Sequence, residues 1–285
     1  MVHLLALAAA AFYGAADFTG GLAARSVTAV VVVLVSQSAG LLMLLAVMPF
    51  LPEATPVRVD LLWGVAAGIS GGVGVGLLYR ALAIGTMAVV APTTAVCAVT
   101  IPVLVAVVMG ERPGMWAGIG IVLGIVSILL VSQQPASDPN AAGAQAAARR
   151  RGLGTALASG VAIGFFLLSL AQTRTEAGMW PLLVSRVTTV SLFAMVGVAT
   201  RPALPSAPRI WMLAMAGGAM DMVANIFYLV AVREGPMSVV VTLASLYPAS
   251  TVLLARIVLG ERLGMVQVAG VGCALAAVLL IVGGT

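Results

Sequence analysis

The sequence predicts an all-α membrane protein with ten transmembrane helices, arranged as two inverted five-helix repeats. The chain of 285 residues is 62% hydrophobic and 8% charged, whereas soluble domains carry about 25% charged residues. Residues 85–130 and 235–280 also align without gaps, and fourteen of the 46 aligned positions are identical. A duplication of this kind in an apolar chain is typical of transporters built from internal repeats.

The helices of the first repeat are predicted from apolar runs of about 20 residues, the length that crosses the hydrocarbon core. Each run ends where proline, glycine or charged residues interrupt it, at 25–26, 52–53, 85–86 and 111–113. The predicted helices are 3–23, 28–49, 60–83, 87–109 and 114–133. Together they form the first predicted domain, residues 1–133.

The second repeat follows a polar linker, Gln134 to Arg151, which is rich in Ala, Gly and Pro and ends in three arginines. Its helices are predicted at 152–173, 178–199, 209–232, 237–259 and 264–283. They form the second predicted domain, residues 152–285. Because five is an odd number, the second repeat has to enter the membrane from the opposite side, and the two repeats are therefore predicted to be inverted.

Several motifs recur in both repeats or at regular spacing, which indicates a structural role. Gly-Glu-Arg ends the fourth helix of each repeat, at 110–112 and 260–262, and is predicted to act as cap, turn and anchor. Four glycines recur every four residues on one face of the third helix, which favours close backbone packing, with a sliding surface as the alternative. They are Gly64, Gly68, Gly72 and Gly76. Pro92 and Pro248 are predicted to kink their helices beside a central cavity.

Three charges lie more than one turn from the ends of the predicted helices, where each costs at least ~2.5–3.5 kcal/mol on insertion scales. Asp221 lies near the middle of 209–232, Asp17 lies in 3–23, and Arg186 lies in 178–199. Neither acid has an acidic counterpart in the other repeat, so both are candidates for proton coupling. Arg186 is predicted to receive a substrate carboxylate. The alternative is that one acid pairs with Arg186 as a structural ion pair.

The other candidates for substrate binding are polar or aromatic residues expected to line the cavity with Arg186. They are Phe12, Tyr13, Gln37, Thr94, Asn225, Tyr228 and Tyr247. His3 is the only histidine, and no Ser/His or His/Glu constellation of a membrane enzyme is present, so no catalytic residue is expected. No cofactor or metal is expected either. The sequence lacks an ATP-binding loop, so a gradient of protons or substrate would supply the energy.

Arginine accounts for the net charge of +5, and in a membrane protein this reflects loop anchoring rather than binding of nucleic acid. More arginines lie on the side away from the two termini, which predicts that this side faces the cytoplasm. The expected partners are the lipid bilayer and a small-molecule substrate. The expected oligomeric state is a monomer or a homodimer.

The duplicated Gly-Glu-Arg ends, Phe12-Tyr13-Gly14 and the helix starts at Ala88–Pro92 and Ser238–Val241 carry a resemblance to a known family. The chain resembles ten-helix members of the drug/metabolite transporter superfamily built from two EamA domains. The resemblance implies a multi-pass protein of a bacterial-type inner or plasma membrane. It also implies a secondary transporter that exports small metabolites, often amino acids or related compounds, from a cavity between the repeats. Family members often have both termini in the cytoplasm, which is contrary to the arginine count.

Alternatives to export stay open at this point. Uptake carriers and exchangers for sugars, nucleotides or drugs share the same short motifs. A structural or sensory membrane subunit without transport activity is a further class, and a flux measurement separates it from a carrier. A passive channel is the last alternative, and the inverted repeat favours a carrier over it.

Overall fold

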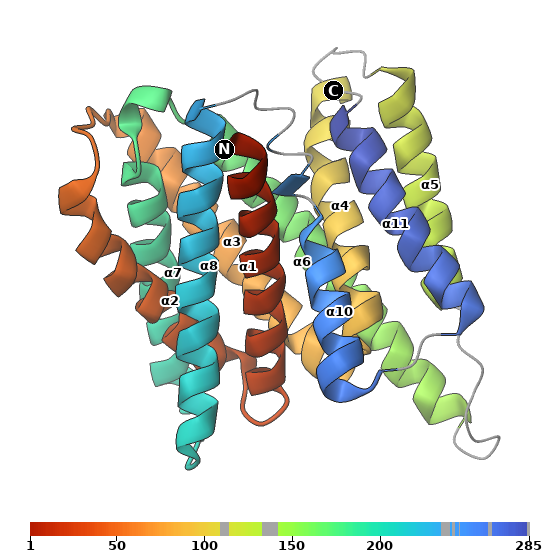
Figure 1. Ribbon diagram of the computed structural model, residues 1–285. Coiled ribbons are helices and arrows are strands. Elements are labelled where there is room, and N and C mark those ends of the chain that lie inside the picture. The colour runs from red at the N-terminus through yellow and green to blue at the C-terminus, as the bar shows by residue number, and fades with distance from the viewer. Residues whose placement is uncertain are drawn as a thin grey trace.

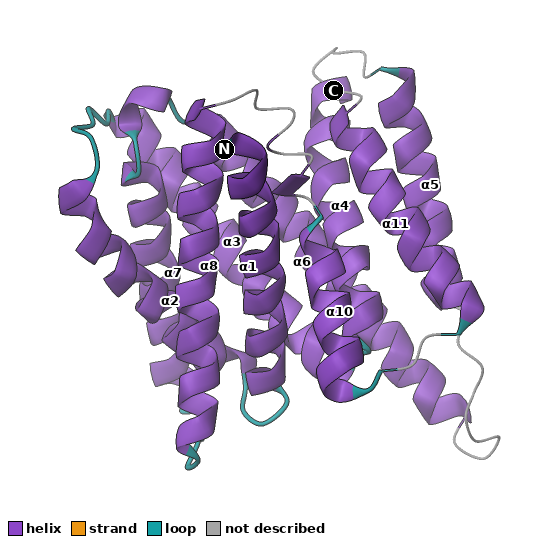
Figure 2. Cartoon of the chain, viewed as in Figure 1, coloured by secondary structure: helices purple, strands orange, loops and turns teal. Residues whose placement is uncertain are grey.

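The computed structural model describes residues 1–108, 114–132, 142–234, 240, 243–244, 246–261 and 264–283. These residues contain ten α-helices and no β-strand (Figure 2). The helices of the first repeat are α1 (Val2–Ala24), α2 (Ala29–Val47), α3 (Arg58–Ile84), α4 (Met87–Val108) and α5 (Met115–Ser132). Those of the second are α6 (Ala142–Ala171), α7 (Trp180–Thr200), α8 (Pro208–Glu234), α10 (Tyr247–Leu259) and α11 (Met265–Gly283).

The helices have the length and composition of a multi-pass membrane protein. Among the described residues, six helices are long and apolar enough to cross a bilayer, and four shorter apolar helical stretches lie in α4, α5, α10 and α11. Large hydrophobic side chains are exposed on the outside of the bundle, for example Trp116 and Val122 on α5. In a membrane protein such a surface faces lipid, and the predicted fold class is confirmed.

The two repeats are inverted in the structure. In Figure 1, α1 runs downward from the end that holds both termini, and its counterpart α6 runs upward. The packing follows the same relationship, since α1 packs on α8 while α6 packs on α3, and α2 packs on α8 while α7 packs on α3. Equivalent helices also pack on each other, as α5 does on α11, α2 on α7 and α4 on α10.

Close approach of glycine backbones sets the spacing of these helices. The four glycines of α3 face α7, and a Cβ atom on Gly68 would lie 2.6 Å from the carbonyl oxygen of Ser185. At the equivalent crossing of α8 and α2, a Cβ atom on Gly218 would collide with the carbonyl oxygen of Ser36. Gly68 and Gly218 are 150 residues apart, and Ser36 and Ser185 are 149 apart. The glycine stripe is therefore a packing surface, as the spacing predicted.

Two predicted boundaries differ from the structure. Helix α6 begins at Ala142, ten residues before the predicted start at 152, because an Ala-rich and Arg-containing segment forms helix without being apolar. Helix α10 begins at Tyr247 after a turn at Leu246, so Pro248 lies in its first turn. A proline there loses no helical hydrogen bond. The predicted kink at Pro248 within one long helix is therefore wrong, and the chain turns just before it.

Candidate functional site

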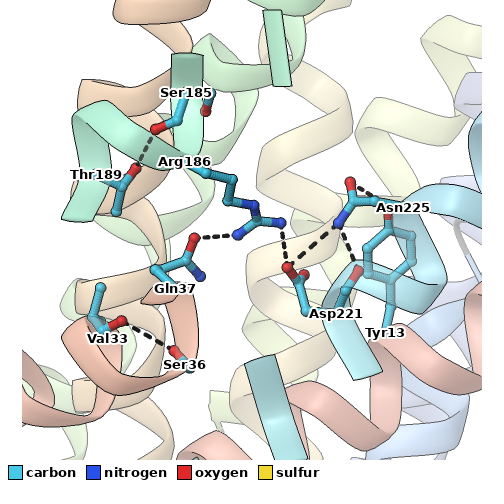
Figure 3. Close-up of polar contacts among 9 residues, drawn as sticks. All are labelled: Tyr13, Val33, Ser36, Gln37, Ser185, Arg186, Thr189, Asp221 and Asn225. Atoms are coloured by element: carbon cyan, nitrogen blue, oxygen red, sulfur yellow. Dashed lines mark hydrogen bonds and ion pairs between the residues drawn. The ribbon is translucent and has the colours of Figure 1, made fainter. Parts of the chain in front are cut away.

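A buried ion pair between Arg186 and Asp221 lies at the centre of the polar residues of the bundle (Figure 3). Arg186 comes from the first half of α7 and is 7% exposed. Asp221 comes from the middle of α8, and its side chain is 23% exposed. A lone charge at this depth is costly, and pairing with the opposite charge and with further hydrogen bonds offsets that cost. The ion pair given as an alternative from the sequence is thus formed by Asp221.

Gln37 of α2 holds the guanidinium of Arg186 from the side opposite Asp221. Its side-chain oxygen accepts a hydrogen bond from Nη1 of Arg186, and Gln37 is itself buried. The Nε–H of Arg186 is also buried, but it has no hydrogen-bond partner among the described residues. Buried donors are nearly always paired, with protein, water or a ligand. The Nε–H of the guanidinium is therefore available to a ligand.

Asn225 extends the polar chain from α8 to α1. It lies one turn beyond Asp221, and its amide nitrogen donates to the backbone oxygen of Asp221 at 2.7 Å and to the Asp221 carboxylate at 3.4 Å. Its side-chain oxygen accepts a hydrogen bond of 3.0 Å from the hydroxyl of Tyr13 on α1. Five predicted site residues, Tyr13, Gln37, Arg186, Asp221 and Asn225, thus form one hydrogen-bonded chain across four helices.

Aromatic rings border this chain. The ring of Tyr13 packs edge-on against Tyr247 of α10, with 6.3 Å between ring centroids. Phe12 packs in the same manner on Phe227 of α8, at 5.7 Å. Tyr247 comes close to α1 because Gly14 has no side chain there. At the same crossing, the hydroxyl of Thr251 on α10 donates a 3.1 Å hydrogen bond to the carbonyl oxygen of Gly14.

Asp17 lies one turn beyond Tyr13 on α1 and so shares its helix face. The side chain is partly exposed and makes no hydrogen bond or ion pair with any described residue. Asp221 is near enough to interact with it electrostatically. The two acids therefore differ in environment, since Asp221 is paired with an arginine and Asp17 is not.

Two predicted residues make no hydrogen bond to this chain, although Tyr228 is near enough to Tyr13 to interact with it electrostatically. Thr94 of α4 is fully buried and donates to the carbonyl oxygen of Ala156 on α6 at 3.2 Å, a contact between packed helices. Tyr228 of α8 packs beside a small apolar cluster that contains Ala6 and Val240. Among the described residues, neither side chain hydrogen-bonds to the group around Arg186.

Tyr79 of α3 is a residue near the site that the sequence reasoning missed. It is 3% exposed, its ring fills the space left by Gly20 of α1, and it is close enough to Asp17 and Asp221 for electrostatic interaction. The sequence does relate it to a candidate, because Tyr79 lies 149 residues before Tyr228, one of the predicted substrate-binding residues. The repeat offset could have found the second tyrosine from the first.

Comparison with known proteins agrees with this architecture. The family described as the EamA-like transporter family matches residues 1–133 and 150–283. A solved structure entitled "Crystal structure of protein" is similar with a TM-score of 0.57, over 98% of this chain and 95% of that chain, at 15% identity. At that identity the likeness concerns the fold alone. No curated protein matches the chain.

Proposed function

Since the chain belongs to the EamA-like transporter family, we propose that it exports small metabolites that carry a carboxylate, such as amino acids or related compounds. It works as a secondary active carrier in the inner or plasma membrane. The two repeats rock about the polar chain around Arg186, so that this site opens to one side of the membrane at a time. Membership of the family supports transport, and the chemistry of the site supports the choice of substrate.

The observation that carries the proposal is the unpaired Nε–H of Arg186 in a buried site. A guanidinium binds a carboxylate through two parallel N–H groups, so a substrate carboxylate supplies the missing acceptor for Nε. Nη2, which Asp221 now occupies, provides the second bond when Asp221 moves aside. The released Asp221 then faces the substrate and can bind its amino group.

The same site offers a means of proton coupling. Asp17 has no partner among the described residues and lies near Asp221, so a proton can neutralise it without breaking an ion pair. Protonation of Asp17 from the side of higher proton concentration, followed by release on the other side, would drive export. The tyrosine hydroxyls of Tyr13 and Tyr79 lie in the same region and can relay or stabilise the proton.

The test uses purified protein in proteoliposomes with an imposed pH gradient. Labelled amino acids, dicarboxylates, sugars, nucleosides and cationic drugs are compared at two pH values. We expect flux of a carboxylate compound and no flux of its methyl ester, because the ester removes the charge that Arg186 binds. Arg186→Lys should fold but lose most of the flux, since an ammonium lacks the planar pair of donors. Flux of neutral or cationic solutes alone would overturn the proposal.

A further inference from the structure

The carboxylate of Glu261 joins three helices at the end of the bundle away from the termini. Glu261 follows α10 and its cap residue Gly260, which is in the left-handed conformation with φ of 65°. Its Oε1 pairs with Nη2 of Arg25, just after α1, at 3.2 Å. The backbone N–H groups of Met87 and Ala88, the first residues of α4, donate to the same carboxylate at 3.2 and 3.1 Å.

These contacts are long-range and run between the repeats. The first N–H groups of a helix have no partner within it and favour negative charge. Such groups are usually capped by a residue just before the helix. Here the cap for α4 comes from a residue 173 positions further along the chain, in the other repeat. The predicted turn at Gly260 is present, but the predicted cap acts on a distant helix.

The solvent exposure of this cluster is compatible with contacts that break and re-form when the end of the bundle opens. Glu261 is mostly buried, with 13% of its side chain exposed, whereas Arg25 is 32% exposed and in reach of water. A partly exposed ion pair is weak enough to break, because water solvates the separated groups. The pair of Arg186 with Asp221 differs on the arginine side, since the Arg186 side chain is only 9% exposed. The ends of α1 and α10 that the cluster joins lie at the lower end of Figure 1.

We propose that Glu261, Arg25 and the first two N–H groups of α4 form a latch that closes this end of the transport pathway. The latch, defined by these residues, holds the end of α10 against the ends of α1 and α4, and it has to break before the site can open toward the arginine-rich side. This inference rests on the alternating access proposed above. Losing the charge on Glu261 should shift the population toward the state open at this end.

The test compares two cysteine reporters at opposite ends of the bundle. Ala255 on α10 lies at the latch end and Ala6 on α1 at the terminal end, and both are fully buried. Each is changed to Cys in a background carrying Cys97→Ala and Cys273→Ala, and a hydrophilic maleimide is applied to the purified protein. We expect Glu261→Gln to raise the modification rate at position 255 roughly three- to tenfold, with no rise at position 6.

Further variants separate the latch from general loosening. Arg25→Gln should raise the rate at position 255 as well, and the double variant should add little, because the two residues share one interaction. Arg209→Gln removes a charge from the same end, where Arg209 makes no ion pair with described residues, and should change nothing. Ala24→Cys, in the last turn of α1, serves as a second reporter if Ala255→Cys does not fold.

The outcomes are distinct. Equal increases at positions 255 and 6 would mean that the variants only loosen the bundle, and unchanged rates at 255 would show that no latch is present; either result overturns the inference. Because labelling requires no substrate, a selective increase at 255 without carboxylate flux would overturn the proposed substrate and keep the latch. Flux of a carboxylate compound with unchanged labelling would keep the proposed substrate and overturn the latch.

Discussion

Tyr13 donates a hydrogen bond of 3.0 Å to Asn225, which lies 212 positions later and in the other repeat. Through this bond α1 is joined to the residues around Arg186, because Asn225 in turn donates to Asp221. The ring of Tyr13 also packs on Tyr247 of α10. Tyr13 therefore connects the charged centre with the helix that ends at the Glu261 latch.

Replacement of Tyr13 by Phe should separate these two contacts. The ring and its packing on Tyr247 remain, while the hydrogen bond to Asn225 is lost. We expect a loss of about 1 kcal/mol in unfolding free energy and an effect of at least the same size on transport, with the Michaelis constant raised roughly fivefold or more. Thermal unfolding and flux at several substrate concentrations check this. A variant with normal flux and strongly reduced stability would show that the bond is only structural.

A double-mutant cycle should show that Arg186 and Asp221 depend on each other. Asp221→Asn leaves a buried positive charge without its partner, and Arg186→Gln leaves the carboxylate alone, so each should destabilise by about 3 kcal/mol or more. The double variant should recover much of that loss, because no uncompensated charge remains. Denaturation in detergent measures all four proteins. Additive effects would contradict the pairing.

Asp17→Asn should leave stability unchanged but alter transport. Since Asp17 makes no ion pair or hydrogen bond with described residues, its neutral form should fold with almost unchanged stability. Transport should lose its response to an imposed pH gradient, while exchange of substrate across the membrane continues. Flux is measured with and without the gradient. An unchanged response would remove Asp17 from the coupling mechanism.

The helix crossings supply a prediction about packing. Gly218→Ala would place a methyl group against the carbonyl oxygen of Ser36, and backbone cannot move aside as a flexible side chain can, so we expect destabilisation of about 1–3 kcal/mol. Gly197→Ala on α7 is the matched control, because nothing lies within 4 Å of a Cβ atom there. The control should be neutral or slightly stabilising. The melting temperatures of the two variants test this, and equal values would contradict the prediction.

The fold was predictable because its signals are local or periodic. Apolar runs define the helices, the duplicated segment around Gly-Glu-Arg defines the repeats, and the odd number of helices in each repeat requires the inversion. The start of α6 escaped because its first turns are helical without being apolar. The turn at Leu246 escaped because hydropathy continues through it.

The site was predictable in part for a related reason. Charges such as Arg186 and Asp221 stand out in an apolar helix, and Gln37 lies 149 residues before Arg186, at the offset that also relates Ser36 to Ser185. The choice of partners is different, since it depends on the rotation and tilt of each helix, which spacing along the sequence does not define. The bond between Tyr13 and Asn225 and the cap that Glu261 provides to α4 are of this kind.

The pairing of Arg186 with Asp221 also bears on electrical behaviour. The two side chains carry opposite charges, so the ion pair forms a unit of zero net charge. Moving such a unit through the field of the membrane does no net electrical work, whereas a single charge would experience about 2.3 kcal/mol per 100 mV. In the cycle proposed above, voltage acts on the protonation of Asp17 and on the cargo. The reorientation of the empty carrier should then depend on membrane potential only when Asp17 is ionised.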